Sequence, residues 1–335
     1  MKTPIVALLL AIVACSTLAA DRTAISCLDE ADAKDCLTSV ALAALARDKS
    51  AESRIDGYAS LLSSLAKAGV RRDDVFVAGV DDASAPVYSR WSLAVARRTY
   101  ALRFETGDSG VDDPGRIEAL ATLLRGRRDG IDRLMVIWTA CEAREGASPS
   151  ALAKWDGVLD RLCRMDFSDG DALENGFPGM SSMAAPIVDA YNRDEQALRR
   201  SLAASLDTLS RYEATLSGKM SSTVREEIHA TLSIGYIFNA SALATAGHRK
   251  ASAKAVEMCL NHLRKAPTIG SSSELHMVSA LASWIYAKAG MREEAMKVVR
   301  DSLAKADRVR SGSGGSKATT IATAIETLRV LESTR

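Results

Sequence analysis

The sequence has few of the residues and patterns that glycan-binding clefts, nucleic-acid interfaces and membrane spans require. Aromatic residues make up 5% of its 335 residues, so stacking platforms for sugar rings are scarce. Basic and acidic residues number 43 and 42, whereas nucleic-acid binders concentrate Lys and Arg to neutralise phosphates. The balanced charge argues against a DNA or RNA partner. No apolar run reaches the roughly 20 residues that a membrane-spanning helix needs, so no such span is predicted.

Motifs for metal and phosphate chemistry are missing or incomplete. There is no CxxC pair, no Cys/His spacing typical of zinc and no G-x-S-x-G elbow. Glu226 and His229 would share one helix face, but a bundle-type metal site needs that motif twice, so both are interpreted as ordinary helix residues. The Gly/Ser-rich residues 311–317 lack the preceding strand of a phosphate-binding loop. No cofactor or metal site is predicted.

The first 20 residues have the organisation of a secretory signal peptide. Lys2 precedes an apolar run over residues 4–14, and small residues follow up to position 20. Residues 12–15, Ile-Val-Ala-Cys, also resemble a bacterial lipobox in which Cys15 would be acylated. Ordinary cleavage after Ala20 is preferred, because the segment before Cys15 is short for a lipoprotein signal. The predicted location is the periplasm, with a membrane-anchored lipoprotein as the alternative.

Five cysteines follow this leader, in a compartment where disulfides can persist. Cys27 and Cys36 flank a short acidic stretch and are predicted to form a local staple near the N-terminus. Cys141 and Cys163 lie on successive predicted helices and form a second candidate pair, with buried free thiols as the alternative. Since the number is odd, Cys259 is left without an assigned role.

The hydrophobic pattern predicts an all-α fold. Apolar residues recur at helical spacing in nearly every segment, and no alternating strand of useful length is present. Asp113-Pro114 and Ser148-Pro149 each place a capping residue before a proline at the first helical position. We expect about a dozen helices, paired in antiparallel hairpins.

A helix-ending pattern recurs along the chain. Ala66-Lys67-Ala68-Gly69-Val70-Arg71 returns as residues 287–292 and, more loosely, as residues 244–249. Each glycine stands where a helix should end in a turn that needs φ > 0. The predicted turn residues are Gly69, Gly107, Gly146, Asn192, Gly247 and Gly290. One hairpin cannot bury its apolar face alone, so the hairpins are expected to stack into a curved superhelical array.

Residues 287–296, followed by Val299 and Leu303, resemble the second half of a tetratricopeptide repeat. Tyr286, Gly290, Ala295 and Leu303 fall at pattern positions, and residues 146–159 match the same pattern. The resemblance implies a tetratricopeptide-like (TPR-like) α-solenoid. It further implies a concave face that holds an extended peptide or the surface of a partner protein, without chemistry of its own.

The predicted organisation has six parts. These are the leader (1–20), an N-terminal helical-repeat half (21–165), an irregular connection rich in Asp, Gly and Met (166–185), a C-terminal helical-repeat half (186–310), a flexible Gly/Ser linker (311–317) and a terminal capping helix (318–335).

The expected function is a non-catalytic periplasmic scaffold for a protein or peptide partner in the cell envelope. One alternative is a lipid-anchored subunit of an envelope assembly complex. The other is an all-α exported glycan hydrolase, for which the chain offers paired carboxylates at 73–74, 112–113 and 293–294. Trp91, Trp138, Trp155 and Trp284 lie in apolar helical patterns and are interpreted as core residues.

Overall fold

The computed structural model describes residues 23–78, 83–104, 149–164, 180–191, 193–267, 273–308 and 314–333. Over these ranges the chain forms twelve α-helices and one short 3-10 helix, without a strand. The all-α prediction is therefore confirmed for the described part of the chain. The predicted leader (1–20), with Cys15, lies outside these ranges. No described helix combines the length and the apolar character needed to cross a membrane.

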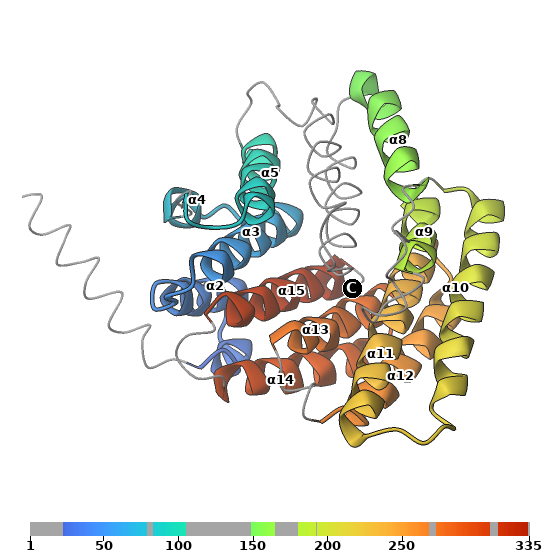
Figure 1. Cartoon of the computed structure of the whole chain (residues 1–335). Helices are drawn as coiled ribbons and strands as arrows, with labels where there is room; N and C mark the ends of the chain where they lie inside the picture. The colour runs from blue at the N-terminus through green and yellow to red at the C-terminus, as the bar shows by residue number, and fades with distance from the viewer. Residues whose placement is uncertain are drawn as a thin grey trace, which may run out of the picture.

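The helices follow one another along the chain as Figure 1 labels them. The N-terminal elements are η1 (Ser26–Asp29), α2 (Ala33–Leu45), α3 (Ala51–Ala68), α4 (Asp73–Ala78) and α5 (Val87–Phe104). The central ones are α8 (Pro149–Arg164), α9 (Met180–Tyr191), α10 (Glu195–Thr215), α11 (Ser222–Thr245) and α12 (Arg249–Arg264). The last three are α13 (Ser273–Lys288), α14 (Arg292–Arg308) and α15 (Gly314–Ser333).

Left-handed residues end several helices. Gly69, Gly247 and Gly290 have φ of 68°, 82° and 78°. At each, the glycine N–H donates to the carbonyl three residues earlier, and the next N–H donates to the carbonyl five residues before itself. This pair of bonds satisfies carbonyls that the helix end leaves unpaired. Among the other predicted turn residues, Gly107, Gly146 and Asn192 lie outside the described residues, and Arg193, with φ of 57°, ends α9.

The buried apolar side chains form two clusters. The first draws mainly on α8 to α13. The second joins α2, α3 and α5 to residues of α14 and α15, among them Val299, Leu303, Ile321 and Ile325. α15 packs against α2 and α3 on one side and against α13 and α14 on the other, as Figure 1 shows. The N-terminal helices therefore share their core with the C-terminal end of the chain.

This arrangement corrects the predicted role of the last helix and two of the predicted segment boundaries. The last helix is an interior element and not a terminal cap, since N-terminal and C-terminal helices both cover it. It begins at Gly314, so residues 314–317 of the predicted linker are its first turn. α9 begins at Met180, so the predicted irregular connection over 166–185 overlaps the first half of that helix.

Close packing explains why glycines begin α15. Gly314 and Gly315 are buried, and a Cβ atom on Gly315 would lie 1.7 Å from the carbonyl oxygen of Ser53. The carboxylate of Asp48, only 3% exposed, accepts the Gly315 N–H at 2.8 Å and the Ser53 hydroxyl at 2.7 Å. This carboxylate takes the position at the helix N-terminus where an anion is favoured. The glycines thus allow close approach of two backbones.

The N-terminal segment is tied to the rest of the molecule at two points. Cys27 and Cys36 lie at disulfide distance, with 5.4 Å between their Cα atoms. The backbone N–H groups of Ala24 and Ile25 donate to the Asp307 carboxylate at 2.9 and 3.1 Å. Cys141 lies outside the described residues, so its pairing with Cys163 stays a prediction, and Cys259 is a buried free thiol.

Candidate functional site

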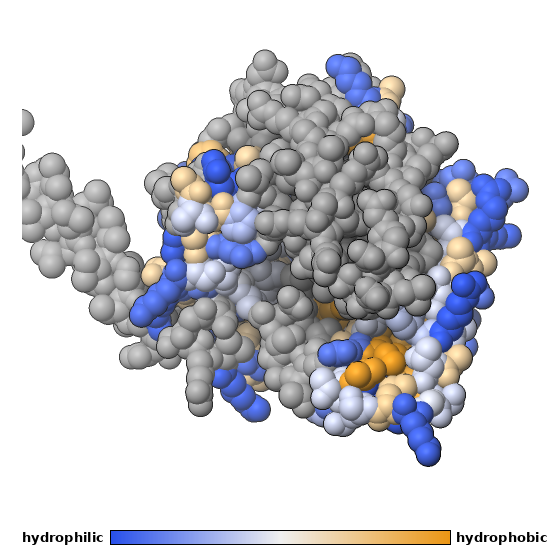
Figure 2. All heavy atoms as spheres, viewed as in Figure 1, coloured by the Kyte–Doolittle hydropathy of each residue, from blue (hydrophilic) through white to orange (hydrophobic). Residues whose placement is uncertain are grey.

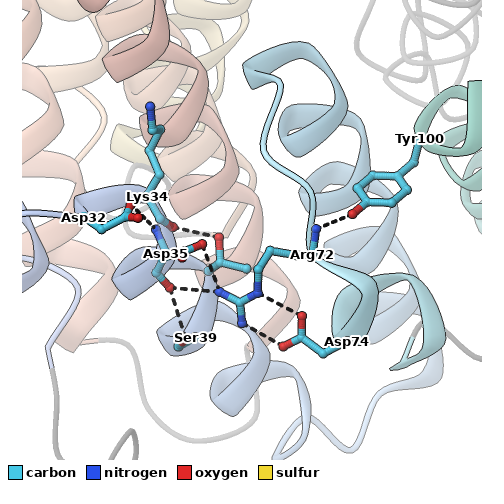
Figure 3. A network of polar contacts seen from close by, with 8 residues as sticks. Asp32, Lys34, Asp35, Ser39, Arg72, Asp74 and Tyr100 are labelled. Atoms are coloured by element: carbon cyan, nitrogen blue, oxygen red, sulfur yellow. Dashed lines mark hydrogen bonds and ion pairs between the residues drawn. The ribbon is translucent and has the colours of Figure 1, made fainter. Parts of the chain in front are cut away.

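The first carboxylate pair considered for a hydrolase is occupied by arginines. Figure 3 shows Arg72 between Asp35 and Asp74. Its guanidinium donates to both Asp74 oxygens, at 2.8 and 2.7 Å, and Nη1 donates to the backbone oxygen and the carboxylate of Asp35. The Tyr100 hydroxyl accepts a hydrogen bond from the backbone N–H of Arg72. Arg71 contacts Asp73, at 3.0 Å between Nε and Oδ1, and both side chains are exposed. This network joins α2, α4 and α5.

The contacts with Arg72 also affect the protonation of Asp74. The Arg72 hydrogen bonds lower the pKa of Asp74, which favours the ionised form over the protonated acid that a glycosidase needs. The second pair, 112–113, lies outside the described residues. In the third pair, Glu293 and Glu294 are exposed in the first turn of α14.

The tryptophans occupy different environments. Trp155 is 2% exposed and belongs to the first core cluster. Trp284 is partly buried, with the Lys288 ammonium 5.2 Å from its ring centroid. Trp91 lies in α5, and Trp138 lies outside the described residues.

A cluster of titratable side chains, three of them buried, lies where α10, α11 and α12 meet. We call His229, His262, Glu213 and Tyr236 the histidine cluster. The Nδ1 atoms of His229 and His262 are 3.0 Å apart, and these side chains belong to residues 7% and 4% exposed. His262 Nε2 lies 3.4 Å from Glu213 Oε1, and the Tyr236 hydroxyl donates to the same oxygen at 2.8 Å. The Tyr236 and His262 rings stack with centroids 5.6 Å apart.

The contacts determine which imidazole nitrogen atoms act as hydrogen-bond donors. When His262 Nε2–H faces the Glu213 carboxylate and the ring is neutral, His262 Nδ1 is an acceptor. His229 Nδ1 must then be the donor in the bond between the imidazoles. Burial is the main cause that lowers the pKa of both histidines. Both imidazoles are therefore neutral at pH 7.

Charged and polar neighbours surround this cluster. Lys265 and Arg225 lower the pKa of His229 further, while Glu213 opposes the lowering at His262. Along the same α10–α11 interface the Ser205 hydroxyl donates to Asn239 Oδ1 at 2.9 Å. The Asn239 amide nitrogen is buried and has no hydrogen-bond partner among the described residues. Polar groups therefore take part in the contact between α10 and α11, in addition to the buried Leu198 and Leu209 of α10.

This site was not predicted from the sequence. The spacing of Glu226 and His229 indicates two ordinary neighbours on one helix, whereas the carboxylate beside the imidazoles is Glu213 from the preceding helix. The useful signal was the separation of 33 residues between the two histidines, close to one helical hairpin. His248 instead pairs with Glu195 at 3.1 Å, where both side chains are exposed. No group of three potential metal ligands occurs among the described residues.

The first stretch with the tetratricopeptide resemblance lies in the α13–α14 hairpin, and the described part of the second lies in α8. Gly290 forms the turn, and Tyr286, Ala295 and Leu303 are 5%, 0% and 0% exposed. These positions therefore serve packing within and around the hairpin. Comparison of the chain with protein-family models, with curated proteins and with solved structures gave no significant match.

Proposed function

We propose that the chain is a non-catalytic interaction protein whose helical hairpins present a surface to a protein or peptide partner. The support comes from the way side chains are used. In the α13–α14 hairpin the pattern residues Tyr286, Ala295 and Leu303 are all buried. These positions are used for packing. The side chains on the outer face of each hairpin are therefore available for contacts with a partner.

The observation that carries this proposal is the exposure of α10. This 21-residue helix buries only Leu198, Ser205 and Leu209, and it lies at the edge of the molecule in Figure 1. Leu206 on its outer face is 47% exposed, and Val224 at the start of α11 is 44% exposed. Figure 2 shows an apolar patch in the region of α11, beside hydrophilic side chains along α10. We assign the contact surface to Leu206, Val224 and their neighbours.

The proposal includes export to the periplasm. It rests on the leader-like first 20 residues and on the Cys27–Cys36 pair, since disulfides persist in oxidising compartments. Intact-mass measurement of the purified protein tests both points. Export with ordinary cleavage predicts an N-terminus at Asp21 and a mass lower than that of the reduced chain by two hydrogen atoms for this cysteine pair. An acylated N-terminal Cys15 would instead support a membrane-anchored protein.

Site-specific cross-linking tests the interaction surface. A photoreactive amino acid replaces Leu206 or Val224 in the full chain, and Arg329, an exposed residue of α15, receives the same change as the control. The proposal predicts that positions 206 and 224 capture one common envelope protein that the control position does not. Equal capture from all three positions, or purified protein that hydrolyses glycan, would refute it. Circular dichroism verifies that each variant is folded.

A further inference from the structure

The histidine cluster can change its hydrogen bonding with pH. A bond between the two Nδ1 atoms at 3.0 Å needs one donor and one acceptor. With both rings neutral, or with one proton added, this requirement is met. With both rings protonated, two N–H donors face each other and the bond is lost.

We propose that the contact between His229 and His262 is an acid-sensitive latch, which holds the last turns of α10 on α11 and α12 and opens when both imidazoles are protonated. This device is separate from the proposed partner binding and does not rest on it.

The attachment of α10 explains why the latch would control this helix. Beyond Leu209 no residue of α10 is buried. Over these last turns Tyr212 is only partly buried against the core. Glu213 adds polar contacts to Tyr236 of α11 and to His262 of α12. Further along the interface, the buried Asn239 amide nitrogen has no hydrogen-bond partner within the described ranges, and such a group makes the closed arrangement less stable.

The groups facing the two imidazoles favour one proton and oppose a second. Glu213 from α10 stabilises a first proton on His262. A second proton on His229 would face this imidazolium together with Arg225 of α11 and Lys265 at the end of α12. Tyr236 stays neutral, because burial and the Glu213 hydrogen bond raise its pKa.

Two other helices packed on α11 place their titratable groups elsewhere. Asp189 of α9 interacts with Ser201, Asp194 and Arg200, towards the other end of α10. Tyr286 of α13 lies under the influence of Glu257 and Glu294. We therefore attribute the acid response of the contact between α10, α11 and α12 to the histidine cluster.

The direction of the response follows from the sign of the pKa changes. Both histidine pKa values are lowered from 6.5 in the closed structure, so the open state, with hydrated imidazoles, binds more protons. The stability of the closed state is fully present above pH 6.5 and declines as the pH falls below it. Each additional proton bound by the open state multiplies the opening equilibrium by up to about tenfold per pH unit.

Amide hydrogen exchange of the full chain tests the latch. At about pH 7.5 and about pH 5.5, which bracket histidine titration, exchange is compared after correction for the intrinsic rates. We expect protection of residues 205–215 to fall about tenfold or more at the lower pH, while α15 keeps its protection. In His229→Gln this fall should be abolished, because the glutamine amide offers a donor or an acceptor without taking up a proton.

Two further variants separate this mechanism from a general acid effect. His248→Gln removes an exposed histidine that also contacts a carboxylate of α10, so it should behave as wild type. Glu213→Gln keeps an acceptor for Tyr236 but loses the charge that stabilises a proton on His262 in the closed state, so the acid-induced fall in protection should be larger than in wild type. Imidazole NMR titration supplies an independent measurement, in which His229 and His262 should titrate below 6.5 in two coupled steps. Equal acid responses of wild type and His229→Gln, or titration at or above 6.5, would overturn the proposal.

Discussion

Replacement of Gly315 by alanine should destabilise the protein strongly, although composition alone predicts that this position lies in a flexible linker. A Cβ atom there would stand 1.7 Å from the Ser53 carbonyl oxygen and 2.5 Å from the Ser53 hydroxyl oxygen. The first atom belongs to the backbone of α3, so a side-chain rotation cannot relieve the overlap. The start of α15 would have to move away from α3.

The size of the effect follows from two contributions. Overpacking of a close-packed site costs about 1–3 kcal/mol. Displacement of α15 also lengthens the bond from the Gly315 N–H to the buried Asp48 carboxylate, now 2.8 Å, and hydrogen bonds to charged groups contribute about 1.5–3 kcal/mol. We expect a loss of about 3 kcal/mol or more. At about 2–4 °C per kcal/mol, the melting temperature should fall by at least about 6 °C.

Thermal and urea denaturation, followed by circular dichroism, measure this loss. Gly218→Ala provides the control, because Gly218 is exposed and its added Cβ atom would meet only the Thr215 carbonyl oxygen at 3.3 Å. Its stability should change by less than about 0.5 kcal/mol. If Gly315→Ala melts within 2 °C of wild type, roughly the effect of 1 kcal/mol or less, the close contact between α15 and α3 is wrong and the linker interpretation stands.

Three further changes test other contacts. Cys36→Ser should lower the free energy of unfolding by about 2–3 kcal/mol, since it opens the short loop closed by Cys27; urea denaturation with and without reductant measures this, and wild type in reductant should match the variant. Gly247→Ala should cost about 1 kcal/mol, because φ of 82° is unfavourable for alanine, and an unchanged melting temperature would contradict the left-handed turn. Asp74→Asn should remove less than about 1 kcal/mol, because this ion pair with Arg72 is half exposed. The lowered pKa of Asp74 means that wild type has this advantage above about pH 4 and loses it as the pH falls through the lowered value, so the melting temperatures should converge in acid.

Local signals in the sequence predicted the helices and their ends well. Pro149 begins α8, where its missing N–H costs nothing. Gly69, Gly247 and Gly290 have the positive φ that the recurring turn requires. In each case the determinant lies within a few residues of the feature, so the sequence pattern contains it.

Features that depend on distant segments were predicted poorly. The Gly/Ser-rich composition around Gly315 predicts a linker. Its role in the first turn of a helix depends on close contacts with Ser53 and Asp48, which are distant in the sequence. The bond between His229 and His262 depends on how α11 and α12 are rotated about their axes, which no single-helix pattern specifies. Helical periodicity identifies a buried face, but it does not say which residue from another helix lies opposite.

The position of α15 also bears on where a partner can bind. In a solenoid each unit contacts only its neighbours, which leaves two open ends and a continuous inner face. Here the final helix lies between α2 and α3 on one side and α13 and α14 on the other, so elements from both ends of the chain share one core. Contact surfaces near α15 are therefore used within the molecule. α10 buries only three of its side chains and carries the exposed Leu206. If hairpins of this chain bind a partner, the α10–α11 edge offers apolar surface that stays exposed in the folded chain. The histidine cluster lies at the same edge.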